Sequence, residues 1–194
     1  MLEQWEALLD ALESGEEARV DSLALKLATE GGEILPFLWE VLTSSSEDGR
    51  WAALRVLAEM GAPPLEWFIW MLADNSPLIR QAAALALVRH PHSRALPALV
   101  EALADPDPLA ADLAMQALIA QGERAVPVLL QVAEELPPAA RIRAVRALAA
   151  LKDARAIPYF MYLVEQGSTL TSYWAAQGLE NLGQNLVYYF PAGR

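Results

Sequence analysis

Residues 74–104, DNSPLIRQAAALALVRHPHSRALPALVEALA, hold one complete copy of a unit that recurs along the chain. The recurrence is marked by a leucine every 30 or 31 residues, at Leu27, Leu57, Leu87, Leu118, Leu148 and Leu179. Each unit contains two amphipathic segments separated by a turn. A period of this length is typical of a solenoid, in which each unit buries its apolar face by stacking on its neighbours. The stretch therefore predicts an all-α repeat fold.

The first helix of each unit is centred on its marker leucine. Four residues after the marker stand Gly31, Gly61, Pro91, Gly122, Lys152 and Gly183. Glycine at that offset favours the left-handed conformation that ends many helices. Four residues before the marker stand Leu23, Ala53, Ala83, Ala114, Ala144 and Ala175. This column of small residues predicts the place where neighbouring helices approach most closely.

The second helix of each unit has an apolar stripe at offsets 0, 3, 4 and 7, as in Leu35, Leu38, Trp39 and Leu42. Such offsets predict the buried face of an amphipathic helix, which places Trp39 in the core. Proline recurs near the start of this helix, at Pro36, Pro97, Pro127 and Pro158. Because proline is tolerated in the first helical turn, these helices are expected to begin just before it, with Ser93 as one N-cap.

The ends of the chain carry incomplete units. Residues 2–12 fit the second-helix pattern, and residues 169–182 fit a lone first helix. The predicted architecture is one domain, residues 1–194, folded as a right-handed α-α superhelix with a half repeat, about five helix pairs and a final helix. Residues 184–194 contain Leu186, Val187, Tyr188, Tyr189 and Phe190. This tail either caps the last repeat or docks on another subunit, and the oligomeric state stays open.

Composition and charge narrow the classes of function. The chain is 55% hydrophobic and contains no cysteine, so disulfides, thiolate nucleophiles and cysteine-ligated zinc are excluded. No basic signal segment and no long apolar run is present, so we expect a cytoplasmic protein without a membrane partner. Residues 1–66 hold 14 acids and 4 bases, which accounts for −10 of the net charge of −11. Such a charge disfavours nucleic acid as a partner.

The segment ALPALVE at residues 95–101, followed by ADPDPLAADLAMQALIAQG, resembles the HEAT-like repeats of the phycobilisome-lyase type. Those repeats run Ala-x-Pro-x-Leu, then Asp-Pro, then Val-Arg and a helix that ends in Ala-Leu-Gly. Arg50, Arg80 and Arg141 occupy the arginine position, from which Ala111 and Ser172 depart, and Asp74, Asp105 and Glu135 occupy the acid position. The resemblance covers residues 14–183 or so. It implies a ladder of Arg50, Arg80, Arg141, Asp74 and Asp105 between repeats, and a concave surface lined by second helices.

Two second-helix columns that leave the apolar stripe carry unexpected aromatic residues. One column reads Phe37, Trp67, Ala98, Val128, Tyr159, and the other reads Glu40, Trp70, Glu101, Gln131, Tyr162. Because the sister repeats manage with small or polar residues there, the repeat itself does not demand the aromatics. We therefore predict a protein-binding surface formed by Phe37, Trp67, Trp70, Tyr159 and Tyr162, since Trp and Tyr dominate interface hot spots. The alternative is that they pack against neighbouring helices.

Other candidate sites favour plainer interpretations. The basic cluster Arg141, Arg143, Arg146, Lys152 and Arg155 suits a solvated helix edge better than a phosphate site, given the net charge. His90 and His92 lack a third ligand nearby in the sequence, so no metal is expected. The acidic stripe Glu3, Glu6, Asp10 and Glu13 is either solvated surface or a docking site for a basic partner.

These patterns predict a non-enzymatic scaffold that binds a protein or peptide on its concave surface. No nucleophile with a base, no phosphate-binding glycine loop and no cofactor motif is found, so no catalytic, cofactor or metal residue is assigned. Two alternatives stay open. The resemblance allows a bilin lyase or chromophore chaperone. It also allows a HEAT-like enzyme acting on nucleic acid, which the net charge disfavours.

Overall fold

A computed structural model describes residues 1–44 and 46–183 of the chain. Within that part the chain forms twelve α-helices and four short 3-10 turns, with no strand. The chain divides into two compact units, Met1–His90 and Pro91–Arg194. The predicted all-α solenoid class is confirmed, whereas the single domain stays a prediction. None of the helices described is long and apolar enough to cross a membrane.

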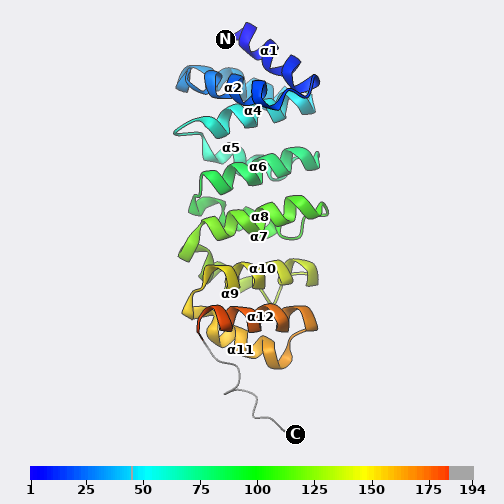
Figure 1. Ribbon diagram of the computed structural model, residues 1–194, viewed down its shortest axis with the longest axis vertical. Coiled ribbons are helices and arrows are strands. Elements are labelled where there is room, and N and C mark those ends of the chain that lie inside the picture. The colour runs from blue at the N-terminus through cyan, green and yellow to red at the C-terminus, as the bar shows by residue number, and fades with distance from the viewer. Residues whose placement is uncertain (45, 184–194) are drawn as a thin grey trace. The chain divides into compact units, whose positions relative to one another are not determined.

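The first unit consists of two layers of helices. Its elements are α1 (Leu2–Glu13), α2 (Glu17–Ala28), η1 (Gly31–Ile34), α3 (Leu35–Ser44), α4 (Glu47–Glu59), α5 (Leu65–Met71) and α6 (Pro77–Arg89). The first helices α2, α4 and α6 stack on one another and form the first-helix layer (Figure 1). The second helices α1, α3 and α5 form the second-helix layer, and each packs against the first helix that follows it.

The second unit repeats this plan. Its elements are η2 (Ser93–Ala95), α7 (Leu96–Ala102), α8 (Pro108–Ala120), η3 (Gly122–Arg124), α9 (Ala125–Val132), α10 (Pro138–Leu151), η4 (Ala154–Ala156), α11 (Ile157–Gln166) and α12 (Thr169–Asn181). Helix α10 packs against α8 and α12, and α11 packs against α12. The half repeat α1 and the lone first helix α12 match the expected ends. Residues 184–194, with their cap or docking role, lie outside the described residues.

The core follows the leucine and alanine columns. The marker leucines are 0 or 1% exposed, and Ala53, Ala83, Ala114, Ala144 and Ala175 are all 0% exposed. Full burial of a leucine side chain contributes roughly 1.5–3 kcal/mol, so the columns supply a large share of the stability of each unit. The alanines allow the stacked first helices to approach closely, which is the role predicted for this column.

The second helices begin where proline predicts, but their entry turns differ from the expectation. Helices α3, α7 and α11 start one residue before Pro36, Pro97 and Pro158. The sequence did not predict the 3-10 turns that precede them. The N-cap expected at Ser93 is wrong, because Ser93 lies inside η2, and Nδ1 of His92 accepts the Arg94 N–H at 3.2 Å. Capping thus occurs at the start of the 3-10 turn.

Helix ends use the left-handed conformation at several positions of the glycine column. Gly31, Gly122 and Gly183 have φ values of 62°, 64° and 73°. Lys152 occupies the same column and also has a positive φ, 54°. An L-residue in this conformation is strained by about 1–2 kcal/mol, and glycine is not. Lys152 is therefore a site of stored backbone strain at the end of α10.

We expect Lys152→Gly to raise the free energy of unfolding by about 0.5–1 kcal/mol, because it relieves this strain. Gly122→Ala is the matched control and should lower stability by about 1 kcal/mol. A Cβ at Gly122 would have no atom within 4 Å, so its effect reports the backbone alone. Urea denaturation measures both. A Lys152→Gly variant less stable than wild type contradicts the prediction.

Gly178 marks a close contact between α11 and α12. A Cβ on Gly178 would lie 2.6 Å from Cε2 of Phe160, whose ring is completely buried. Gly178→Ala should therefore destabilise the protein by about 1–3 kcal/mol through overpacking, although alanine is the better helix former. Thermal unfolding checks this, and adding Phe160→Leu should restore part of the loss. A Gly178→Ala variant as stable as wild type would show that the ring moves aside freely.

Candidate functional site

Three tryptophans from two second helices meet on the first unit. Trp39 comes from α3, and Trp67 and Trp70 come from α5. The ring of Trp39 lies 5.0 Å from that of Trp67 and 5.4 Å from that of Trp70, measured between centroids. Trp39 is 42% exposed and Trp70 is 49% exposed, whereas Trp67 is half-buried. We call these three residues the tryptophan cluster.

Trp39 was expected in the core, and that prediction is wrong. Trp39 is at offset 4 of the apolar stripe, at the margin of the buried face, where Val100 is buried but Ile69, Leu130 and Met161 are also only half-buried. An indole is too large to fit at this margin, so part of its ring remains exposed and the rest packs on α5. The exposure of Trp39 could have been predicted by comparing this column across the repeats, because tryptophan is its only aromatic residue.

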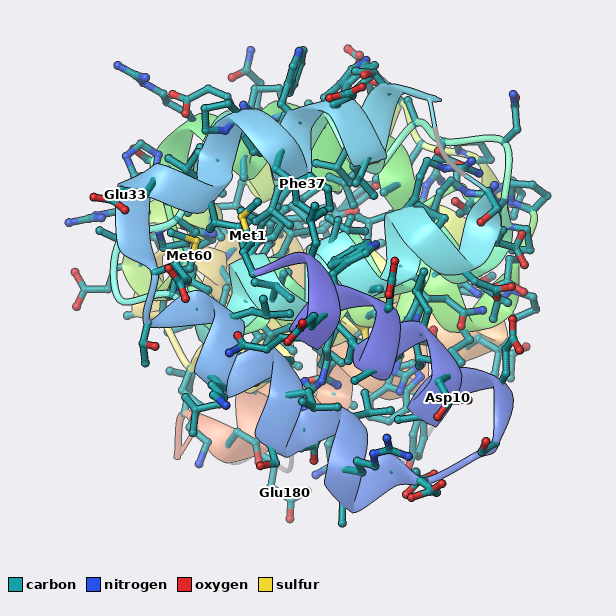
Figure 2. All side chains as sticks on the ribbon, turned by 90° about the horizontal axis from the view of Figure 1, so that it is seen from above. Met1, Asp10, Glu33, Phe37, Met60 and Glu180 are labelled. Atoms are coloured by element: carbon teal, nitrogen blue, oxygen red, sulfur yellow. The ribbon has the colours of Figure 1, made fainter. Side chains whose placement is uncertain are left out.

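Phe37 does not join the tryptophan cluster. Its half-buried ring packs edge to face on Trp5 of α1, with centroids 5.1 Å apart and planes at 85°. Figure 2 looks onto the first unit from the α1 end and labels Phe37 among the side chains next to α1. Phe37 thus links α1 to α3, and the aromatic residues of this layer run from α1 through α3 to α5.

The two predicted tyrosines form a separate pair on α11 of the second unit. Their rings stack with centroids 6.4 Å apart and planes at 20°. Tyr162 is 49% exposed, while Tyr159 is half-buried and donates a hydrogen bond to Oε1 of Glu134 at 2.7 Å. Burial, and then this hydrogen bond, raises the pKa of Tyr159 well above its ordinary value. Tyr159 is therefore a neutral phenol that is already held in place.

Helix α12 adds an aromatic group that sequence reasoning missed. Leu170 is 56% and Tyr173 is 57% exposed, and the ring of Tyr173 packs edge to face on Trp174 at 5.2 Å. The guanidinium of Arg146 lies 5.0 Å from the centroid of the Trp174 ring, a cation-π contact. These residues lie on a first helix, outside the second-helix columns in which the sequence pattern predicts a binding surface.

The arginines of the predicted basic cluster each have their own contacts. Arg141 donates to the carbonyl oxygens of Ala133 and Glu134. Nε of Arg143 donates to Oδ1 of Asp112 at 2.8 Å, and Arg155 forms hydrogen bonds to both carboxylate oxygens of Asp153. Internal contacts at each guanidinium fit the interpretation as a helix edge better than a shared phosphate site.

The predicted ladder of acids and arginines takes several forms. Arg50 of α4 pairs with Asp74, which follows α5, with Nε 3.0 Å from Oδ2 and Nη2 3.2 Å from Oδ1. Arg80 instead donates to the carbonyl oxygens of Asp74 and Asn75, which precede its own helix α6. Arg141 of α10 makes the same kind of contact with the carbonyl oxygens that follow α9. Oδ1 of Asp105 accepts the Asp107 N–H at 2.8 Å. Arg80 and Arg141 therefore tie α6 and α10 to the end of the preceding second helix through backbone oxygens, whereas Arg50 ties α4 to the acid that follows α5.

A second set of ion pairs links the first helices of the first unit. Asp21 of α2 pairs with Arg55 of α4 at 2.5 Å, and Arg55 lies 3.4 Å from Glu59. Both oxygens of Glu59 accept hydrogen bonds from Arg89 of α6, at 2.6 and 2.9 Å. We call this set the charge ladder. The hydrogen bond from Arg89 lowers the pKa of Glu59, because it stabilises the carboxylate.

The two histidines take part in local hydrogen bonds. Nε2 of His90 donates to the carbonyl oxygen of Ala58 at 2.9 Å, and the His90 ring is nearly parallel to that of Phe68. His92 caps η2 as described. Within residues 1–44 and 46–183, no group of three or more acidic or histidine side chains is arranged to hold a metal ion.

The acidic stripe of α1 is exposed along its length. Glu3, Glu6, Asp10 and Glu13 all have exposed side chains, and Asp10 lies 3.3 Å from Arg19 of α2. Figure 2 shows Asp10 on the outer side of α1. The stripe therefore lies on the side of α1 opposite its buried Trp5 and Leu8.

Comparison with known proteins identifies the type of repeat. A family model described as HEAT repeats matches residues 34–119, and one described as PBS lyase HEAT-like repeat matches residues 140–161. A crystal structure of an engineered protein is 20% identical, with a TM-score of 0.49, and the match covers 92% of this chain and 96% of that one. No curated protein matches the sequence. The chain is an α-solenoid repeat protein. Its repeats are HEAT-like.

The charge ladder leads to a prediction about pH. Since the folded-state pKa of Glu59 is lowered, its stabilising contribution is present above the unfolded value and is lost as pH falls through the folded value. Glu59→Gln should therefore be less stable than wild type at pH 7, and the difference in the free energy of unfolding should disappear as pH falls through the lowered pKa of Glu59. Urea denaturation across this pH range measures it, with exposed Glu165→Gln as the baseline. A gap that stays constant with pH would contradict this role.

Proposed function

We propose that this protein is a non-enzymatic scaffold that holds a protein or peptide at the tryptophan cluster, on the second-helix layer of its first unit. The observation that carries the proposal is the contact of Trp39 with both Trp67 and Trp70 while two of these rings stay 42 and 49% exposed. Aromatic anchors of this kind supply most of the binding energy in protein interfaces. The HEAT-like repeat supports a scaffold of this class.

The cluster goes beyond what packing of the repeat requires. At the positions of Trp67 and Trp70, the second unit has small or polar residues on α7 and α9, namely Ala98, Val128, Glu101 and Gln131. These repeats stack without an indole. Leaving large indole surfaces in water has no benefit for the free energy of folding, since apolar area is stabilising only when it is buried. A partner that covers the cluster would bury that area.

A chromophore-handling role is the second candidate. The PBS lyase HEAT-like match over α10 and α11 favours it, and that helix pair carries the stacked tyrosines Tyr159 and Tyr162. Mixing the protein with a linear tetrapyrrole and recording its absorption spectrum tests the role. An unchanged spectrum would exclude the chromophore-handling role and leave the scaffold as the remaining candidate function.

We expect the proposed surface to be sensitive to loss of a single ring. With the protein immobilised and exposed to lysate from its source organism, Trp70→Ala should reduce the amount of its captured partner by about tenfold or more, as at an interface hot spot. Quantitative mass spectrometry measures the capture. Tyr173→Ala removes a ring of similar exposure on α12 and serves as the control. Equal capture by wild type, Trp39→Ala and Trp70→Ala would show that the cluster is not the binding site.

A further inference from the structure

We infer that residues 184–194 bind to an exposed face of α12 on their own chain, in the register of a second helix. We call these residues the closing segment. Two observations support this assignment. One face of α12 lacks the cover that its sister helices have, and the closing segment repeats the apolar pattern of the second helices. The assignment does not depend on the tryptophan cluster, which belongs to the other unit.

One face of α12 is more exposed than the same face of the earlier first helices. Three residues before the marker leucine, Ala176 of α12 is half-buried, whereas the side chain in this column is fully buried at Leu54, Ala84, Met115 and Val145. Three residues earlier again, Tyr173 is 57% exposed, whereas this column is half-buried at Trp51, Gln81, Asp112 and Ile142. Because residues three apart share a helix face, Tyr173 and Ala176 form one surface. We call it the end face.

The end face is where a following repeat would pack. Helices α4, α8 and α10 each have a later first helix of the same unit packed on them, namely α6, α10 and α12. Within residues 1–44 and 46–183, no helix follows α12. The surface turns polar one turn beyond Ala176, where Glu180 accepts a hydrogen bond from Gln177 at 2.7 Å. The apolar part is therefore small, and a short segment is enough to cover it.

Gly183 sets the register of the closing segment. Three glycines stand four residues after their marker leucines with φ values of 62°, 64° and 73°, namely Gly31, Gly122 and Gly183. After each of the first two, a 3-10 turn leads to the first stripe residue of a second helix, at Leu35 and Val126. Both of these residues stand four positions after the glycine. The same offset from Gly183 gives Val187.

From this start the closing segment repeats the stripe of the second helices. Phe190 takes offset 3, at which all five counterparts are 0% exposed: Leu38, Phe68, Leu99, Leu129 and Phe160. Tyr188 takes offset 1, at which all five counterparts are exposed: Pro36, Glu66, Pro97, Pro127 and Pro158. The register thus separates two aromatic residues that lie two positions apart. Phe190 is expected to be buried, and Tyr188 to face water.

The reach of the segment matches the end face. Gly183 is seven residues from Ala176 and seven from Phe190. Seven residues of α12 rise about 10 Å, and a 3-10 turn followed by three helical residues rises about 12 Å. A chain that turns back over α12 at Gly183 therefore brings Phe190 level with Ala176. Pro191 cannot continue a helix, so the segment supplies about one turn of cover.

The absence of cysteine allows a direct test of the register. The full-length variants Phe190→Cys and Tyr188→Cys each carry a single thiol, whose rate of reaction with a maleimide dye is measured under native conditions. The thiol of Phe190→Cys should react about tenfold or more slowly, because a buried thiol reacts only when it opens to solvent. In urea the two rates should be equal. Equal native rates, or a slower reaction of Tyr188→Cys, would overturn the assignment.

A second substitution tests where the thiol is protected. Ala176→Arg places a charged side chain on the end face, and should raise the reaction rate of Phe190→Cys to that of Tyr188→Cys. Leu170→Arg is the matched control on α12, since Leu170 is 56% exposed and its counterparts Leu78 and Leu109 are 49 and 54% exposed. It should change the rate less than about twofold. Circular dichroism checks the fold of each variant. Protection that survives Ala176→Arg would show that the thiol is buried elsewhere.

Dilution distinguishes binding on the same chain from binding on a second copy. Protection of the Phe190→Cys thiol should be unchanged by about hundredfold dilution, because contact within one chain does not depend on concentration. Protection that is lost on dilution would place the segment on a second copy and overturn the assignment.

Hydrogen exchange of α12 provides a readout that needs no thiol. Phe190→Ser should speed exchange of the amides in residues 169–183 about tenfold, because an uncovered terminal helix opens more often. Tyr188→Ser is the control and should change these rates less than about twofold. Unchanged exchange in Phe190→Ser would contradict the cover of α12.

Discussion

The structure depends on the close approach of successive first helices. Within each unit every first helix packs against another first helix, and α4 and α10 have one on both sides. The inner positions therefore hold alanine, and Ala53, Ala83 and Ala144 are completely buried. A larger side chain at these positions would separate the stack and remove the marker leucines from their contacts. The last first helix goes further, since Gly178 leaves room for the ring of Phe160. The second helices then occupy the other layer, where the size of a side chain is less restricted.

This arrangement also explains where the charges lie. Stacked first helices bring the edges of successive repeats together, so Asp21, Arg55, Glu59 and Arg89 form one ladder across three helices. In the second unit, Arg143 and Asp112 make the same kind of link between α10 and α8. The arginines of the first-helix layer thus form ion pairs with acidic side chains of the same layer. The second helices of the first unit carry no base, and their tryptophans form the surface to which we assign binding.

Pattern reasoning succeeded where a residue has the same role in every repeat. The marker leucines, the alanine column and the prolines at α3, α7 and α11 all have one geometric cause, so their recurrence reveals that cause. It failed where one repeat departs from the others. Trp39 shares a column with Ile69 and Val100, yet its indole is too large for the margin of the core and stays 42% exposed. The cap at His92 was also missed, because it belongs to the 3-10 turn η2 that precedes α7, and such a short turn has no apolar period that a sequence pattern could reveal.

The repeat length, the helices and the buried side of each helix can be predicted from the amino-acid sequence alone, because they follow from local periodicity and from the sizes of recurring residues. The sequence also located four of the residues of interest, Trp67, Trp70, Tyr159 and Tyr162. The folded chain was needed to see that Trp39 joins Trp67 and Trp70, that Phe37 packs on Trp5, and that the tyrosines form a separate pair. These contacts join residues on different helices, and the angle between packed helices cannot be read from the pattern within either one.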